Sequence, residues 1–181
     1  MNTKRLSVRD ICFIGIFTAV IAVCAQISIP MPYGVPLTLQ TFAVMLAGII
    51  LGAKKAAIAL VVYLLLGSVG APVFTQFGGG FYRVIGPWGG FLMSYPFMAF
   101  VAGLGSDTGK KYCIAICLAA SAILNLSAGM FWYAFINEVG LTEAFAAAFA
   151  PFIIVESIKM ALAFSVGLPV RYALSKGGIL V

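Results

Sequence analysis

Apolar residues dominate this chain, and glycine, proline and charged residues interrupt them at intervals. These interruptions delimit six apolar stretches, at residues 10–29, 37–53, 56–70, 88–105, 112–136 and 151–174. A helix needs about 20 residues to cross a bilayer, a length that the first, fifth and sixth stretches meet comfortably. The second and third are short, so Lys54 and Lys55 between them are expected to reach for the membrane surface. The pattern predicts an all-α membrane protein with six transmembrane helices, forming one domain over residues 1–181.

The composition supports a membrane location for the whole chain. Hydrophobic residues make up 63% of the sequence and charged residues only 9%, whereas a soluble domain carries about a quarter charged residues. We expect a multi-pass protein in the plasma membrane of a prokaryote.

The basic residues predict the orientation of the six helices. If both termini are cytoplasmic, the cytoplasmic side holds nine of the eleven basic residues: Lys4, Arg5, Arg9, Lys54, Lys55, Lys110, Lys111, Arg171 and Lys176. Only Arg83 then lies outside, and Lys159 lies within the membrane. This asymmetry follows the positive-inside rule. It accounts for the net charge of +6 without nucleic-acid binding.

The residues needed for catalysis or metal binding are scarce. The chain has no histidine, and its four cysteines all lie in apolar stretches. The segment GLGSDTGKK at 103–111 has leucine at the first glycine position of a phosphate-binding loop and lysine in place of its final Ser/Thr. We therefore expect no catalytic residues, no metal site and no cofactor, and ATP hydrolysis only on partner chains.

Glu156 and Lys159 stand out within the last apolar stretch. Three residues apart, they share one face of a helix. With Pro151 opening that helix, they lie in the outer half of the membrane, where a charge costs on the order of 2.5–3.5 kcal/mol. One interpretation is a structural or snorkelling ion pair. The other, which we favour, is a polar ligand site reached from outside.

A glycine-rich segment at 67–90 precedes the fourth stretch. It holds eight of the twenty glycines together with several aromatic residues. Glycine permits sharp turns and close approach of the backbone to a small molecule. We expect this segment to form an extracellular lid in which Arg83 pairs with a carboxylate, although an ordinary interfacial loop with an aromatic belt remains an alternative.

Two further groups of residues suggest contacts. Thr38, Gln40 and Thr41 open the second stretch and either bind an amide-like ligand or cap the helix. The first stretch carries small residues at spacings of three and four, which allow membrane helices to approach closely; they are Gly15, Thr18, Ala19, Ala22 and Ala25. This stripe contacts either a partner subunit or other helices of the bundle.

Four motifs occur in an order that resembles a known family. They are VPLTLQTFAVMLAGIILG, GAPVF, GPWGGF and P-x-x-x-x-E-x-x-K, and the resemblance runs over roughly residues 10–175. They resemble the BioY family, the biotin-specific S components of energy-coupling-factor (ECF) vitamin transporters. This chain has Trp88, Ser94-Tyr95 and Glu156 where the family usually has Thr, Gly-Phe and Asp.

The resemblance implies a six-helix S component that binds biotin at the outer side under a loop. Glu156 would accept the ureido N–H groups, Lys159 would donate to the ureido oxygen or the tail, and Arg83 would hold the tail. The full expected ligand-binding set is Glu156, Lys159, Arg83, Gln76, Phe74, Tyr82, Trp88, Gly89, Thr38 and Gln40.

The resemblance also implies partner subunits. Gly15, Ala19, Ala22 and Ala25 would meet a transmembrane coupling subunit, which two cytoplasmic ATPases energise. A stand-alone secondary carrier for a small amphipathic metabolite is the alternative, although carriers usually have more spans and internal repeats. A membrane enzyme is a distant third because catalytic groups are lacking.

Overall fold

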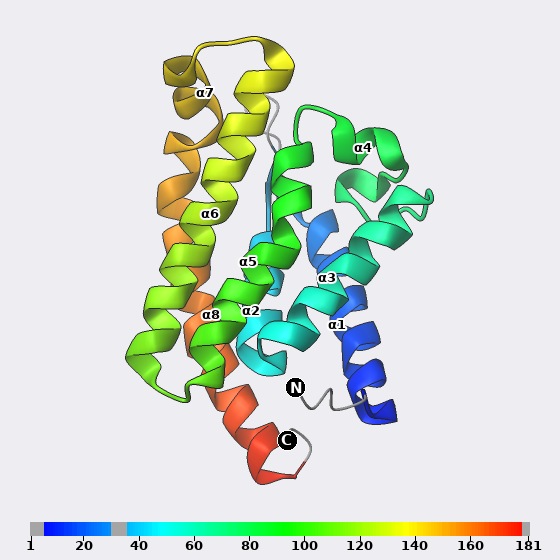
Figure 1. Ribbon diagram of the computed structural model, residues 1–181, viewed down its shortest axis with the longest axis vertical. Helices are drawn as coiled ribbons and strands as arrows, with labels where there is room; N and C mark the ends of the chain where they lie inside the picture. The colour runs from blue at the N-terminus through cyan, green and yellow to red at the C-terminus, as the bar shows by residue number, and fades with distance from the viewer. Residues whose placement is uncertain (1–5, 30–35, 179–181) are drawn as a thin grey trace, which may run out of the picture.

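The computed structural model describes residues 6–29 and 36–178, and nearly all regular structure within them is helical (Figure 1). The α-helices are α1 (Val8–Gln26), α2 (Gln40–Leu51), α3 (Ala53–Ser68), α4 (Phe81–Ile85), α5 (Gly89–Asp107), α6 (Lys111–Asn137), α7 (Leu141–Ala148) and α8 (Ala150–Lys176). A 3-10 turn, η1 (Thr75–Phe77), and an antiparallel two-residue ladder between β1 (Ser28–Ile29) and β2 (Leu37–Thr38) complete the described structure. The prediction of an all-α fold is confirmed.

The six longest helices, α1, α2, α3, α5, α6 and α8, follow the six predicted apolar stretches in order. The second helix begins at residue 40 rather than 37 because Leu37 and Thr38 pair with the segment that follows α1. Within the described residues, three helical stretches are long and apolar enough to cross a membrane: Val8–Gln26, Lys111–Asn137 and Leu141–Lys176. They correspond to the first, fifth and sixth predicted spans, and the total of six remains a prediction.

Helix α2 lies at the centre of the bundle, which explains how so short a helix is stable there. Ten of its twelve residues are buried, and it packs against α1, α3, α5 and α8. Its environment is therefore protein on most sides, so its length need not match the thickness of the lipid.

A glycine forms the corner between α2 and α3. Gly52 has φ 79°, a left-handed conformation that glycine adopts without steric cost. A Cβ at this position would lie 2.4 Å from Oδ1 of Asp107, whose Oδ2 accepts a hydrogen bond from the Ala53 N–H at 3.1 Å. The corner therefore needs a residue without a side chain, and α5 caps the start of α3.

The basic residues gather mainly at one end of the bundle. The α2–α3 corner with Lys54 and Lys55, and the α5–α6 turn with Lys110, lie at the end where both termini are drawn, whereas α4 with Arg83 lies at the opposite end (Figure 1). The predicted cytoplasmic residues Lys4 and Arg5 lie outside the described residues. The orientation of the helices in the membrane remains a prediction. Below we call these the terminal end and, after the predicted lid, the lid end.

Candidate ligand site

A cavity of about 280 Å³ opens at the lid end, between helices α2, α5, α6 and α8 and the segment 69–88. Its polar or charged lining residues are Thr38, Gln40, Thr41, Thr75, Gln76, Arg83, Asn125, Glu156 and Lys159. Its apolar or aromatic ones are Pro36, Phe74, Trp88, Phe91, Leu92, Tyr95, Leu126 and Phe152. An apolar pocket with a few placed polar groups is the usual form of a small-molecule site.

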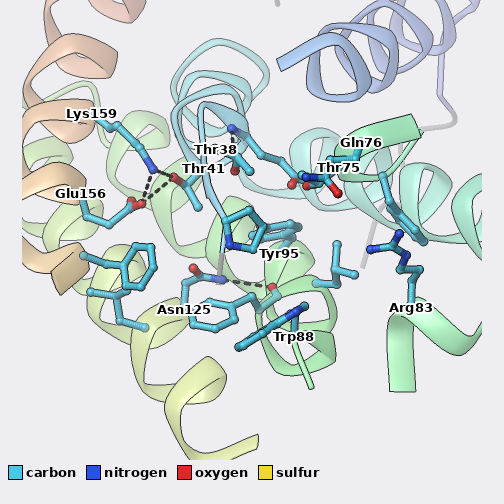
Figure 2. A pocket seen from close by; sticks show the side chains of 17 residues that line it. Thr38, Thr41, Thr75, Gln76, Arg83, Trp88, Tyr95, Asn125, Glu156 and Lys159 are labelled. Carbon is cyan, nitrogen blue, oxygen red and sulfur yellow. Dashed lines mark hydrogen bonds and ion pairs between the residues drawn. The ribbon is translucent and has the colours of Figure 1, made fainter. Parts of the chain in front are cut away.

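Glu156, Lys159 and Thr41 form a closed triangle on one side of this cavity (Figure 2). The ammonium of Lys159 lies 2.6 Å from Oε1 of Glu156 and donates to the Thr41 hydroxyl at 2.9 Å, and that hydroxyl donates to the same Oε1 at 2.7 Å. The two charged residues are only 5% and 4% exposed. Helix α8 supplies both charges, and α2 supplies the hydroxyl.

The second carboxylate oxygen of Glu156 distinguishes this triangle from an ordinary ion pair. Oε2 is buried and has no hydrogen-bond partner among the described residues. A buried acceptor left without a donor costs about 1–3 kcal/mol, and more when the group is charged. Beside the Lys159 cation, the cavity therefore contains a buried acceptor to which no described residue donates.

The segment that closes the lid end is fixed to the helices by side chains of α1 and α3. Gln26, in the last turn of α1, donates from Nε2 to the carbonyls of Val73 (3.4 Å) and Phe74 (3.1 Å), and its Oε1 accepts from the Phe77 N–H at 2.7 Å. The Tyr63 hydroxyl of α3 donates to the Val73 carbonyl at 3.0 Å and accepts from Gln40 at 2.7 Å. Both anchors bind backbone groups of the segment.

Phe74 wedges this segment into the bundle. Its ring is 2% exposed and meets Tyr63 edge to face at a centroid distance of 5.5 Å. Any Cβ at position 67 would lie 2.1 Å from this ring, so Gly67 is needed to admit it. Gln76 and Phe77 next to it have φ of 58° and 53°, a left-handed conformation that is uncommon for residues other than glycine. The strained turn persists because Gln26 and Phe74 hold both of its sides.

A second polar group lies on the wall formed by α5 and α6. Asn125, 2% exposed, donates from its amide to the Ser94 hydroxyl at 2.7 Å and to the Phe91 carbonyl at 3.1 Å. Trp88 lies nearby and stacks on Tyr133 at a centroid distance of 5.3 Å. Sequence reasoning missed Asn125 and Tyr95 as lining residues, although a lone asparagine within an apolar stretch was a signal for the first.

Eight of the ten expected ligand residues line the cavity: Glu156, Lys159, Arg83, Gln76, Phe74, Trp88, Thr38 and Gln40. The other two do not. Tyr82 is 63% exposed and its hydroxyl accepts from Nε of Arg83 at 3.3 Å, because its place beside Arg83 on the short helix α4 turns it outward. Gly89 opens α5 and packs against the Val84 carbonyl, where any Cβ would lie 1.8 Å from that oxygen.

Arg83 and the triangle lie on opposite sides of the cavity in Figure 2. Thr41, expected only as a polar group or cap of α2, proves to be the third member of the triangle. The Thr38 hydroxyl accepts from the N–H of Gln40, the first residue of α2, at 3.3 Å.

The small residues of α1 divide into two groups. Gly15 and Ala19 are exposed, Ala22 is half-buried, and Ala25 is fully buried. At 3.6 residues per turn the stripe spans about 120° of the helix, so one edge faces the bundle. On that edge the Thr18 hydroxyl donates to the Ala59 carbonyl of α3 at 3.1 Å. The expected partner contact at Ala25 is therefore wrong for this arrangement, and Gly15, Ala19 and Ala22 remain available.

Comparison with known proteins extends over almost the entire chain. The BioY family matches residues 1–176. The chain is 36% identical over 158 residues to the probable biotin transporter BioY of Pyrococcus horikoshii, covering 87% of this chain and 93% of that protein. It is 38% identical over 167 residues to the biotin transporter BioY of Thermotoga maritima, covering 90% and 96%.

A solved structure agrees in fold with the arrangement described above. The crystal structure of the S-component for biotin from an ECF-type ABC transporter superposes with a TM-score of 0.84 at 26% identity, covering 95% of each chain. The order of helices, the match along the sequence and the motifs quoted above therefore lead to one assignment. This chain belongs to the BioY family.

Proposed function

We propose that this chain binds biotin in the cavity at the lid end and serves its uptake as the substrate-specific component of an ATP-driven ECF transporter. The relatives cited above are named as biotin transporters, and the structural neighbour is titled as an S-component for biotin. The observation within this chain that carries the proposal is the buried, unpartnered Oε2 of Glu156 beside Lys159 in the cavity.

The chemistry of biotin suits the two sides of the cavity. Its ureido ring has N–H donors for Oε2 of Glu156 and a carbonyl that accepts from the Lys159 ammonium. The carboxylate at the other end of the molecule suits Arg83, which lies across the cavity from the triangle (Figure 2). Trp88, Phe91 and Phe152 supply apolar walls for the thioether ring and the aliphatic chain between the polar ends.

The segment 69–88 acts in this proposal as a lid over bound biotin. It contributes Phe74, Gln76 and Arg83 to the cavity lining, and Gln26 and Tyr63 hold its backbone. Opening the lid requires these hydrogen bonds to break, so they set the rate at which biotin enters and leaves.

The transport function requires partners in a prokaryotic plasma membrane. We propose that Gly15, Ala19 and Ala22 of α1 pack against a transmembrane coupling subunit, with two cytoplasmic ATPases supplying the energy. Gly15 and Ala19 are exposed on the outer face of α1, and Ala22 is half-buried and packs partly against the core. Any Cβ at Gly15 would meet no atom within 4 Å. Small residues let another membrane helix approach closely.

Equilibrium binding of labelled biotin to the purified chain tests the ligand. We expect saturable binding without ATP, and no displacement by riboflavin or thiamine at concentrations equal to that of unlabelled biotin. Displacement by either vitamin as effectively as by biotin would overturn the assignment.

Co-purification with the coupling subunit tests the partner. Ala19→Leu should weaken it while leaving biotin binding unchanged, because the larger side chain separates the helices. Ala120→Leu, at an exposed alanine of α6, is the matched control and should assemble normally. Normal assembly and uptake by Ala19→Leu would exclude this face as the contact.

A further inference from the structure

A second cavity, of about 320 Å³, lies at the terminal end of the bundle. It is bounded by the α2–α3 corner, the last turns of α5 and the last third of α8, which meet at that end in Figure 1. The basic residues that line it are Lys54, Lys55 and Arg171, and the acidic one is Asp107. We call it the terminal notch. It shares no lining residue with the cavity at the lid end.

Arg171 is held in a fixed position at the inner wall of the notch. Its Nη1 donates to the Ile49 carbonyl at 2.7 Å and to the Ser106 hydroxyl, so it caps the last turn of α2. Its Nη2 lies 3.7 Å from Oδ1 of Asp107, beyond ordinary hydrogen-bond distance. The side chain is 30% exposed. The guanidinium is therefore preoriented and keeps donor capacity for an anion.

The charges around the notch do not cancel. Lys55 is neutralised by Asp10 at 2.6 Å, and Asp107 balances Arg171. Lys54 is exposed and makes no ion pair or hydrogen bond with any other described residue. One positive charge therefore remains, which is the complement of one phosphodiester anion.

An apolar surface leads away from these charges along α5. Phe100 and Leu104 line the notch, and with Phe97 they are the exposed residues of this face, at 65%, 39% and 44% for positions 97, 100 and 104. Spacings of three and four put them on one side of the helix, over about 10 Å of its axis. The surface runs from the charged end toward the middle of the predicted membrane.

We propose that the terminal notch binds one anionic phospholipid, with its phosphate between Lys54 and Arg171 and an acyl chain along Phe97, Phe100 and Leu104. Basic pockets between helices on the cytoplasmic side of a membrane are suited to such headgroups. A free phosphate would fit the charges but would leave the apolar surface uncovered. No residue of α1 lines the notch, so the site is separate from the face proposed for the coupling subunit and does not depend on biotin binding.

Lipid retention by the purified chain tests this proposal. The chain is equilibrated with a mixture of phosphatidylglycerol and phosphatidylcholine, and retained lipid is counted by native mass spectrometry. We expect one tightly retained phosphatidylglycerol on the wild type. Lys54→Gln should lower that retention about fivefold, the contribution of one basic residue at an anionic lipid surface. Lys54→Arg should restore it.

Lys111→Gln is the matched control, since Lys111 is an exposed lysine of the same end and lies outside the notch. It should retain phosphatidylglycerol like the wild type. Equal retention by the wild type, Lys54→Gln and Lys111→Gln would overturn the proposal, because binding would then reflect the general surface charge.

Two additional experiments distinguish a lipid headgroup from a free phosphate as the bound anion. Phosphatidylglycerol with a photoreactive acyl chain should label residues 97–104, and excess inorganic phosphate should not displace it. Displacement by phosphate without labelling of that segment would show a free-anion site instead of a lipid site. If no variant retains lipid and Lys54→Gln weakens assembly with the coupling subunit, the notch binds protein and the proposal fails.

Discussion

Helix α8 presents two buried or half-buried cations to α2, twelve residues apart, and the two are satisfied in different ways. Arg171 is bound by a backbone carbonyl of α2, a serine of α5 and, more loosely, Asp107, all of which belong to the protein. Lys159 is bound by Thr41 and by Glu156, whose second oxygen has no donor among the described residues. Arg171 keeps exposed donor capacity at the notch, but its network leaves no buried side-chain atom without a partner among the described residues, whereas the network of Lys159 leaves Oε2 of Glu156 buried and unpartnered. We call the first the closed network and the second the open network.

The difference gives a physical criterion for recognising a buried charge whose hydrogen bonds the described residues leave incomplete. Burial of an ion is tolerated when its hydrogen bonds are complete. The network around Arg171 meets that condition and fastens α2, α5 and α8 together. The network around Glu156 does not meet it, and it lies in a cavity. An open network maintained at this cost is expected where a ligand completes it.

Breaking the open network should have the largest effect. Glu156→Gln and Lys159→Met should each weaken biotin binding roughly 10- to 100-fold, because a hydrogen bond to a charged group is worth about 1.5–3 kcal/mol. Isothermal titration on each purified variant measures this. A merely structural ion pair predicts lower thermal stability with nearly unchanged affinity, so melting curves of the same samples separate the two interpretations.

Breaking the closed network should lower the stability of the fold and leave biotin affinity unchanged. Arg171→Met removes the cap from α2 and leaves Asp107 without its cation, which should destabilise the fold by about 1–3 kcal/mol. Biotin affinity of the folded protein should stay within error of the wild type. A large loss of affinity in a folded Arg171→Met protein would show that the two ends of α8 are coupled, and the contrast would fail.

Weakening the attachment of the proposed lid, segment 69–88, should change the rate of biotin dissociation. Gln26→Leu keeps a similar side-chain volume but removes three hydrogen bonds to the backbone of the segment 73–77. Biotin dissociation should accelerate roughly 5- to 10-fold, equivalent to the net loss of one or two hydrogen bonds. Stopped-flow chase with unlabelled biotin gives the rate. An unchanged rate would mean that another contact controls the lid.

The smallest effect is expected at Tyr82. The ring lies outside the cavity, and its hydroxyl contacts Arg83 on an exposed surface. Tyr82→Phe should therefore change biotin affinity by no more than about twofold, as is usual for a weak exposed contact. A tenfold loss, measured by the same titration, would place Tyr82 in the site after all and would require α4 to turn inward when biotin binds.

The six-helix fold could be predicted from the sequence because long apolar helices differ from their connections in composition and in the spacing of apolar residues. The six stretches and the glycine-rich segment were visible in these features. The short elements α4, α7 and the β1–β2 ladder could not be predicted in this way. They depend on tertiary contacts that no local sequence pattern encodes.

The charged residues of the ligand site could be predicted from the sequence. Glu156, Lys159 and Arg83 stood out because ionisable groups are rare in this chain. Asn125 and Tyr95 did not, since neutral residues in apolar helices usually pack or bond internally. The role of Thr41 required the crossing of α2 and α8, and the split of the α1 stripe required the rotation of α1 about its axis. Both are set by packing.

The most direct test of the open network is an experimental structure of the chain with biotin bound. We expect a ureido nitrogen of biotin at hydrogen-bond distance, about 2.7–3.2 Å, from Oε2 of Glu156, with the carboxylate of biotin toward Arg83. A bound biotin with no polar atom near Oε2, and with the triangle of Glu156, Lys159 and Thr41 unchanged, would contradict this expectation.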